Sequence, residues 1–467
     1  ECDWSSDVCS SDLVFSFLSC VSIYSLLTVM AAAGGAASGG KVDEDLYSRQ
    51  LGVYGMETMG KLVQMKVLVV GLKGVGVEAA KNLILAGPAV VDLFDPKPVS
   101  GEDLGYNFYL TPEHIGKPRA ECCVGKLAEL NGYVRTSVIS ESELSEAILA
   151  RYDVVLMTDT PLGDLVRWNK YCHTHEPAIG FIACDIRGLA GRVFVDFGPA
   201  HNVIDVDGEP VRSAIVAGVV AEPGAPVVIN CHDRKRHGLY DGDWVIFREL
   251  QGAEELNDGV PRQITRCGKY SFELKKLVAA GKKPGDEGEP SMIESVSNDY
   301  VRNGIVEQVK VPVTQTFASL DERLAAPVPK GDWAGLLTPD LGKFGRPYQL
   351  HAAWAGLDAF AAAHDGAMPT PHSAEHVAEV TAGTKAWVEA TEGFEHEVED
   401  SVSESLARYA AVELPALAAF FGGVVAQEIV KFTGKFSPLR QWLYLDAFEI
   451  ATKTEGAAEG EFAGTGD

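Results

Sequence analysis

The most constraining feature of the chain is an apolar run that ends in a glycine-rich turn and continues as an amphipathic segment. Residues 65–70 read MKVLVV, residues 71–76 read GLKGVG and residues 77–84 read VEAAKNLI. Consecutive β-branched and leucine residues favour a strand buried on both faces, and the apolar positions after the turn repeat at helical spacing. A second apolar run at 89–94 ends at Asp95. This order predicts the βαβ unit of a Rossmann-like α/β fold with a mostly parallel sheet.

The turn departs from the phosphate-binding pattern in its middle. The dinucleotide fingerprint is GxGxxG, in which the second glycine lets the phosphates approach the backbone. Gly71 and Gly76 take the first and third glycine positions, but Lys73 takes the second and Gly74 follows it. The lysine side chain would crowd a phosphate, although its charge could attract one. We therefore expect a degenerate, unoccupied nucleotide site at Gly71, Gly74, Gly76 and Asp95.

Length, charge and cysteine content narrow the classes of function. A chain of 467 residues suggests several domains. The formal net charge of −26 argues against a nucleic-acid partner and favours either a partner with a basic face or simple solubility. The nine cysteines show no disulfide pattern, so we expect a reducing compartment.

The first residues look unlike a natural terminus. Residues 13–30 are uncharged and mostly apolar, but acidic residues and no lysine or arginine precede them. A signal peptide or membrane anchor needs basic flanks, so we expect no membrane association. We expect Met30 to be the natural start, residues 1–29 to be non-native, and 1–40 to be a disordered leader and linker.

The pattern of predicted elements changes twice along the chain. Strands alternate with helices over 41–188, which predicts the first part of the parallel-sheet domain. Short runs separated by Asp-Gly turns over 189–290 predict a small all-β barrel insertion. Alanine-rich amphipathic segments over 291–400 predict a helical-bundle insertion. Residues 401–452 would return to the sheet domain, and the acidic tail at 453–467 is expected to be disordered.

Three local features make these predictions specific. Residues 192–196 are expected to be a strand of the all-β insertion. Residues 441–448 are expected to be a strand that rejoins the parallel sheet. Ser373 is expected to cap the start of a helix, because a serine side chain can accept a hydrogen bond from the first free N–H groups.

Few residues carry recognisable chemistry. Cysteine and histidine lie close together at 172–175 and at 231–237, but neither group has further zinc ligands at a suitable spacing. A Cys/His nucleophile would also need an orienting third group, so structural roles are the better interpretation. Arg49 precedes the core strand, and its guanidinium is suited to binding phosphate oxygens. From its residue type alone, a surface arginine remains the simpler interpretation.

Several motifs resemble the N-terminal half of eukaryotic ubiquitin-activating enzyme, in family order from about residue 43 to 449. They are LYSRQL at 46–51, GLKGVGVE at 71–78, IGKPRAE at 115–121, RHG at 236–238, DGD at 241–243, ELN at 255–257, GGVVAQE at 422–428 and QWLYLDA at 441–447. The resemblance implies an inactive adenylation domain of the ThiF/MoeB-like superfamily. It also implies that the all-β insertion is the first catalytic-cysteine half-domain, without the reactive cysteine, and that the helical insertion is the four-helix bundle.

The resemblance further implies how the chain takes part in catalysis. In the family, this half pairs with an active adenylation half, which binds ATP and Mg²⁺ and adenylates ubiquitin before a separate domain forms the thioester. Residues 104–109 lack the arginine of active halves. We therefore expect this half alone to bind no cofactor and to be inactive. Arg49 matches the arginine lent to the ATP phosphates of the partner half. The expected partners are that half, in cis or in trans, and ubiquitin, in the cytoplasm and nucleus.

Two alternatives stay open. The chain could be a stand-alone regulatory subunit of a heterodimeric enzyme that activates a ubiquitin-like modifier. It could also be an NAD-dependent oxidoreductase, since Asp95 stands where an acid can hold a ribose. Lys73 in the turn and the lack of a recognisable hydride-transfer site count against the second alternative.

Overall fold

The chain divides into two compact units. The computed structural model describes residues 43–222, 225–276, 296, 300–327, 336–338, 341–343, 345–394 and 396–451. The expected leader at 1–40 and tail at 453–467 lie outside these residues. The first unit, here called the sheet unit, comprises residues 1–200, 316–433 and 438–467. The second, the barrel unit, comprises residues 201–315 and 434–437.

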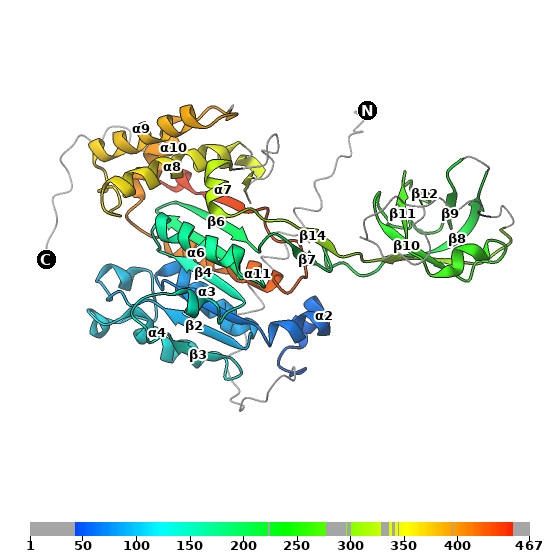
Figure 1. Cartoon of the computed structure of the whole chain (residues 1–467), viewed down its shortest axis with the longest axis horizontal. Helices are drawn as coiled ribbons and strands as arrows, with labels where there is room; N and C mark the ends of the chain where they lie inside the picture. Colours follow the sequence, from blue (N-terminus) through cyan, green and yellow to red (C-terminus); the bar gives the residue numbers. More distant parts are fainter. Residues whose placement is uncertain are drawn as a thin grey trace. The chain divides into compact units, whose positions relative to one another are not determined.

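The sheet unit is built on an eight-stranded sheet with the order β15-β16-β6-β5-β4-β1-β2-β3 (Figure 1). Its strands are β1 (Lys66–Val70), β2 (Val90–Phe94), β3 (Arg135–Val138), β4 (Val154–Thr158), β5 (Gly180–Arg187), β6 (Ala190–Asp196), β15 (Leu336–Leu337) and β16 (Trp442–Asp446). The neighbours β3, β2, β1, β4 and β5 are all parallel. This is the strand order of one Rossmann-like half, and the predicted fold class is confirmed.

Helices cover both faces of this sheet (Figure 1). One face carries α2 (Ser48–Leu62), α3 (Gly74–Ala86), α4 (Arg119–Ala128) and α11 (Pro415–Lys431). The other carries α5 (Glu146–Leu149), α6 (Leu162–Thr174), α7 (Leu320–Ala325) and the helices of the bundle. Alternate residues of β1 pack into the hydrophobic cores on the two faces of the sheet. Val67 and Val69 pack on the face covered by α3 and α11, and Leu68 and Val70 pack on the opposite face. Burial on both faces explains why residues 67–70 of this strand are all apolar.

The bundle helices are α8 (Arg346–Ala363), α9 (Ala374–Ala390) and α10 (Asp400–Tyr409), which pack against one another. Ser373 caps α9 as predicted, because its hydroxyl accepts a hydrogen bond from the His376 N–H at 3.3 Å. The helix α10 packs with α8 and α9, although the sequence pattern had assigned residues beyond 400 to the returning sheet domain. Among the described residues, no helix is long and apolar enough to cross a membrane.

One strand prediction needs correction and another is confirmed. Residues 192–196 do not belong to the barrel: they form most of β6, which pairs antiparallel with β5 in the main sheet. The chain reverses between these strands at Gly188, whose φ of 58° favours glycine. The returning strand β16 rejoins the main sheet as predicted, where it pairs antiparallel with β6 and parallel with β15. A local sequence pattern predicts a strand and does not specify its partner, which is why residues 192–196 were expected in the barrel.

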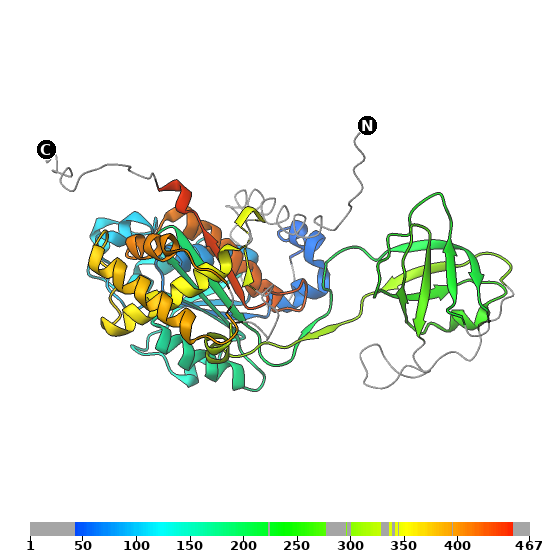
Figure 2. The same ribbon diagram turned by 90° about the horizontal axis from the view of Figure 1, so that it is seen from above.

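The barrel unit is a closed six-stranded barrel, with the order β10-β11-β12-β9-β8-β13. Figure 2 shows these strands, in green, curving around a common axis. Its strands are β8 (Ser213–Val220), β9 (Val228–Cys231), β10 (Trp244–Arg248), β11 (Arg262–Thr265), β12 (Ser271–Lys276) and β13 (Ile305–Val309). A separate pair is formed by β7 (His201–Val203) and β14 (Val313–Gln315). The barrel extends past residue 290, the expected end of the insertion, because β13 pairs with both β8 and β10. Closure of the barrel thus depends on a strand far along the chain.

Candidate functional site

The glycine-rich turn joins β1 to α3, and two of its glycines are required by close packing. Gly71 has a φ of 83°, and a side chain there would overlap the backbone of Thr158. A side chain on Gly76 would overlap the carbonyl oxygen of Gly71. The Thr158 hydroxyl donates to the carbonyl oxygens of Val70 and Gly71, at 3.1 and 3.0 Å. The turn is therefore tied to β4 and keeps its Rossmann-like path whether or not it binds a nucleotide.

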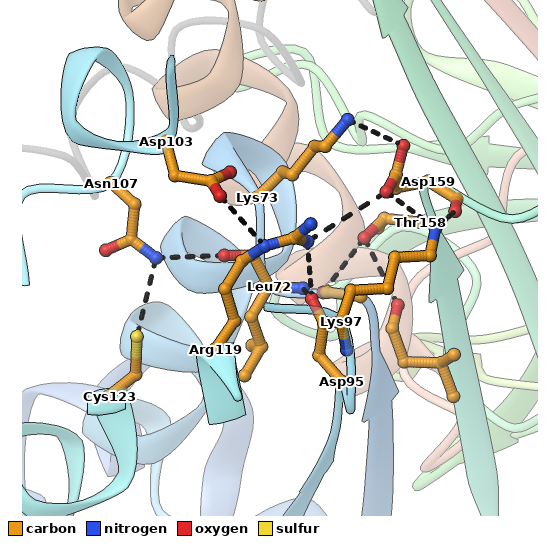
Figure 3. A network of polar contacts seen from close by, with 12 residues as sticks. Leu72, Lys73, Asp95, Lys97, Asp103, Asn107, Arg119, Cys123, Thr158 and Asp159 are labelled. Carbon is orange, nitrogen blue, oxygen red and sulfur yellow. Dashed lines mark hydrogen bonds and ion pairs between the residues drawn. The ribbon is translucent and has the colours of Figure 1, made fainter. Parts of the chain in front are cut away.

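Asp95, at the end of β2, is used by the chain itself (Figure 3). Its Oδ2 accepts hydrogen bonds from the Leu72 backbone N–H at 2.8 Å and from Arg119 Nη1 at 2.7 Å. Its Oδ1 accepts one from the Lys97 backbone N–H at 3.1 Å. Because Asp95 is also buried, neither oxygen is presented to a ribose. This arrangement removes the main residue on which the NAD-dependent alternative was based.

Arg119 connects Asp95 to a second buried carboxylate. Its Nε lies 3.2 Å from Asp103 Oδ2, which also accepts a hydrogen bond from the Ser100 N–H at 2.7 Å. Burial acts to lower the pKa of Arg119, but Asp95 and Asp103 together hold that pKa above its ordinary value. The buried guanidinium of Arg119 is therefore balanced by two carboxylates of its own chain.

Lys73 is also engaged within the chain (Figure 3). Its Nζ lies 3.0 Å from Asp159 Oδ1, and Lys97 Nζ lies 3.0 Å from the other oxygen of the same carboxylate. Burial acts to raise the pKa of Asp159, but the two lysines outweigh it and the pKa is lowered. The charge that could have attracted a phosphate is therefore paired with Asp159.

A fourth carboxylate reaches the turn from the segment that precedes α11. A side-chain carbon on Gly74 would lie 2.7 Å from Glu413 Oε2 and 2.9 Å from Ala418 Cβ. Burial raises the pKa of Glu413 to about 7, against the opposing effects of Lys73, Arg187 and the Gly74 N–H. Sequence reasoning missed Glu413, because no motif surrounds it and it is distant from the turn in the chain. The structure thus brings Gly71, Gly74, Gly76 and Asp95 together, but around the chain's own side chains.

Arg49 lies away from the glycine-rich turn. It is exposed on the first turn of α2, and its guanidinium forms no ion pair within the described part of the chain. The N-cap of this helix, Tyr47, packs at the far end of α3, where a side-chain carbon on Gly87 would lie 2.5 Å from its hydroxyl oxygen. A helix as long as α3 spans about 20 Å. Arg49 is therefore separate from the turn of its own half.

The two cysteine–histidine groups are structural. His173 Nδ1 pairs with Asp196 Oδ2 at 2.9 Å, and burial raises the pKa of Cys172 to about 12. Both ring nitrogens of His237 are engaged, one with the Gly268 carbonyl at 2.9 Å and the other with the Leu239 N–H at 3.0 Å. Burial also raises the pKa of Cys231, to about 11. In the described ranges, no group of His, Cys, Asp or Glu side chains is arranged to hold a metal ion.

Comparison with known proteins gives a consistent assignment. The family model "Ubiquitin-activating enzyme E1 FCCH domain" matches residues 224–310, and "Ubiquitin-activating enzyme E1 four-helix bundle" matches residues 311–387. Ubiquitin-activating enzyme E1 1 of Candida albicans is 37% identical over 419 residues, which cover 89% of this chain and 38% of the relative. Ubiquitin-like modifier-activating enzyme 1 of Homo sapiens is 40% identical over 413 residues, which cover 87% and 36%.

One solved structure matches this chain only weakly. The crystal structure of E. coli MccB with succinimide aligns with 34% of this chain and 49% of its own, at a TM-score of 0.29 and 20% identity, so no functional argument rests on it. The fold is a Rossmann-like half that carries two insertions, and the chain's own side chains occupy its glycine-rich turn. The sequence matches support this chain as an N-terminal half of a ubiquitin-activating enzyme E1. It spans little more than a third of the length of the curated relatives that it matches.

Proposed function

We propose that this chain is the supporting half of a ubiquitin-activating enzyme. An active adenylation half, in the same longer chain or in a separate one, binds ATP and Mg²⁺ and adenylates ubiquitin, and a further domain forms the thioester. This chain provides the scaffold and a surface that contacts ubiquitin. The observation that carries the proposal is the turn itself, where Lys73, Asp95 and Glu413 are all engaged within the chain.

Ubiquitin-dependent exchange between ATP and pyrophosphate tests this proposal. We expect exchange by this chain alone to remain at background, because its own side chains occupy the nucleotide turn. Addition of an active adenylation half should produce exchange that depends on both components. Ubiquitin-dependent exchange by this chain alone would refute the proposal.

Arg49 has a defined part in this proposal. Its exposed guanidinium supports a role outside its own half, because a free guanidinium can bind phosphate oxygens in a bidentate manner. We propose that it contacts the ATP phosphates bound by the active half and stabilises the charge that develops on the leaving pyrophosphate.

The substitution Arg49→Ala in the complete enzyme tests this role. It should slow adenylation by about 10²-fold, a typical effect of losing one preorganised donor, and leave the melting temperature unchanged. Arg151→Ala is the matched control, since Arg151 is an exposed arginine whose contacts are an ion pair with exposed Glu141 and a hydrogen bond to the Ala147 carbonyl. Equal adenylation rates for both variants would exclude the role of Arg49.

We also propose a cytoplasmic and nuclear location. The cysteines in the described part of the chain are free thiols, as in proteins of reducing compartments. A fluorescent fusion of the full chain should distribute between these two compartments, and its secretion would contradict the proposal.

A further inference from the structure

The N-terminus of α3 is a position where other Rossmann-like proteins bind phosphate. The first N–H groups of any helix have no partner within the helix, and the helix dipole adds partial positive charge there. The N-cap of α3 is Lys73, whose side chain makes no capping hydrogen bond. The first N–H groups therefore point toward whatever lies in front of Gly74.

The carboxylate of Glu413 lies in front of Gly74. Only glycine at position 74 permits this approach, because a side-chain carbon there would come within 2.7 Å of Glu413 Oε2. That oxygen is buried and has no hydrogen-bond partner within the described part of the chain. The remainder of Glu413 is only partly buried, so the carboxylate points inward from the surface.

The segment that carries Glu413 is held on both sides. The Val412 carbonyl accepts a hydrogen bond from the Gly188 N–H at 2.7 Å, in the turn between β5 and β6. On the other side, Leu414 is the N-cap of α11, and its carbonyl accepts from the Ala418 N–H at 2.9 Å. The position of the carboxylate is therefore fixed by the backbone on either side and does not depend on a flexible loop.

The charges around Glu413 explain why an added phosphate is excluded. Lys73, Arg187 and the Gly74 N–H face the carboxylate with positive charge, and Asp159 faces it with negative charge. Lys73 is already paired with Asp159. A phosphate at this position would overlap the Glu413 carboxylate.

We infer that the Glu413 carboxylate is a built-in ligand of the α3 N-terminus, which occupies the anion position of the turn and closes it to phosphate. The half is thus closed by a specific side chain as well as by its altered glycine pattern. Removal of this carboxylate leaves an anion site formed by the Gly74 N–H and Lys73. The inference rests on the same turn as the proposed function, but its test uses neither ubiquitin nor an active adenylation half, so the two proposals can fail separately.

Binding of inorganic pyrophosphate to the full chain at pH 8 tests the inference. The wild-type protein should give no binding heat in titration calorimetry and no change in melting temperature. Glu413→Ala should melt at a lower temperature than wild type and bind pyrophosphate. Its melting temperature should rise by about 5 °C when pyrophosphate is near 100 times its dissociation constant. Glu413→Ser serves the same comparison if the alanine variant does not fold.

Three controls make the result specific. Glu428→Ala removes a buried glutamate within α11, which pairs with Lys431, and should not create pyrophosphate binding. Lys73→Ala combined with Glu413→Ala should abolish the binding. Glu413→Gln keeps the side-chain volume at the turn, so this variant should not bind pyrophosphate. A folded Glu413→Ala variant that ignores pyrophosphate, or a wild-type protein that binds it equally well, would overturn the inference.

Discussion

Lys73 Nζ and Asp159 Oδ1 lie 3.0 Å apart, so the lysine that replaces the second glycine of the fingerprint is paired within its own chain. Lys97 holds the other oxygen of the same carboxylate. A lysine in a glycine-rich turn suggests, by residue type, a phosphate ligand. In this protein, it closes a set of ion pairs above the C-terminal ends of the parallel strands. The fold of a nucleotide-binding unit is retained while its polar groups are used internally.

Gly76→Ala should destabilise the sheet unit strongly. The added methyl group would overlap the carbonyl oxygen of Gly71, and both groups belong to backbone that packing holds in place. We expect a loss of about 3 kcal/mol or more in the free energy of unfolding, measured by urea denaturation.

Gly125→Ala is the matched control for Gly76. Gly125 lies inside α4, and a side-chain carbon there would meet nothing within 4 Å. Alanine favours helix more than glycine does, so this change should stabilise by up to about 1 kcal/mol. Equal effects of the two substitutions would show that close packing does not require glycine at position 76.

The sequence allowed the βαβ unit to be predicted but not the use of its polar residues. The run from Val67 to Asp95 combines apolar periodicity with glycines, and both are local signals. The sequence permits a ribose contact of Asp95 in the NAD-dependent alternative, because its contact with Arg119 is formed only by tertiary folding and is not visible in the sequence. Glu413 was not predicted, because its contact with Gly74 joins distant segments. The same limit applies to β6 and β13, whose partners are chosen by long-range pairing.

Arg119→Ala should be among the most damaging substitutions in the sheet unit. It would leave Asp95 and Asp103 buried without their shared cation, and loss of one partner from a buried ion pair destabilises by about 3–5 kcal/mol. Arg151→Ala breaks the exposed pair with Glu141 and an exposed hydrogen bond to the Ala147 carbonyl, and should change stability by less than about 1 kcal/mol. Urea denaturation of both variants measures the difference, and similar midpoints would contradict a buried charge network.

Asp159 should contribute to stability in a pH-dependent manner. Its folded-state pKa is lowered from 3.8, against burial, by Lys73 and Lys97, so folding favours the ionised carboxylate. This contribution is present above the unfolded value of 3.8 and is lost as pH falls through the folded pKa. The free energy of unfolding of Asp159→Asn should therefore fall less steeply than that of wild type below about pH 4. Parallel curves for the two proteins in that range would exclude the contribution.

The contribution of His173 to stability should depend on pH in the opposite direction to that of Asp159. Its hydrogen bond to Asp196 raises its folded-state pKa above 6.5, although burial opposes the shift. The contribution of the charged imidazole to stability is fully present below the unfolded pKa and is lost as pH rises through the folded value. The stability of His173→Gln should therefore lack the decline that wild type shows above about pH 6.5.

His351 provides an internal contrast for the His173 measurement. Burial lowers its pKa to about 3, so it stays neutral in the folded protein beside the Tyr444 hydroxyl at 2.5 Å. For this group, stability is lost as pH falls below the unfolded value of 6.5. NMR titration of the two imidazoles should show one midpoint above 6.5 and no titration of the other near neutral pH. Coincident midpoints would mean that neither the Asp196 hydrogen bond nor the burial of His351 controls protonation.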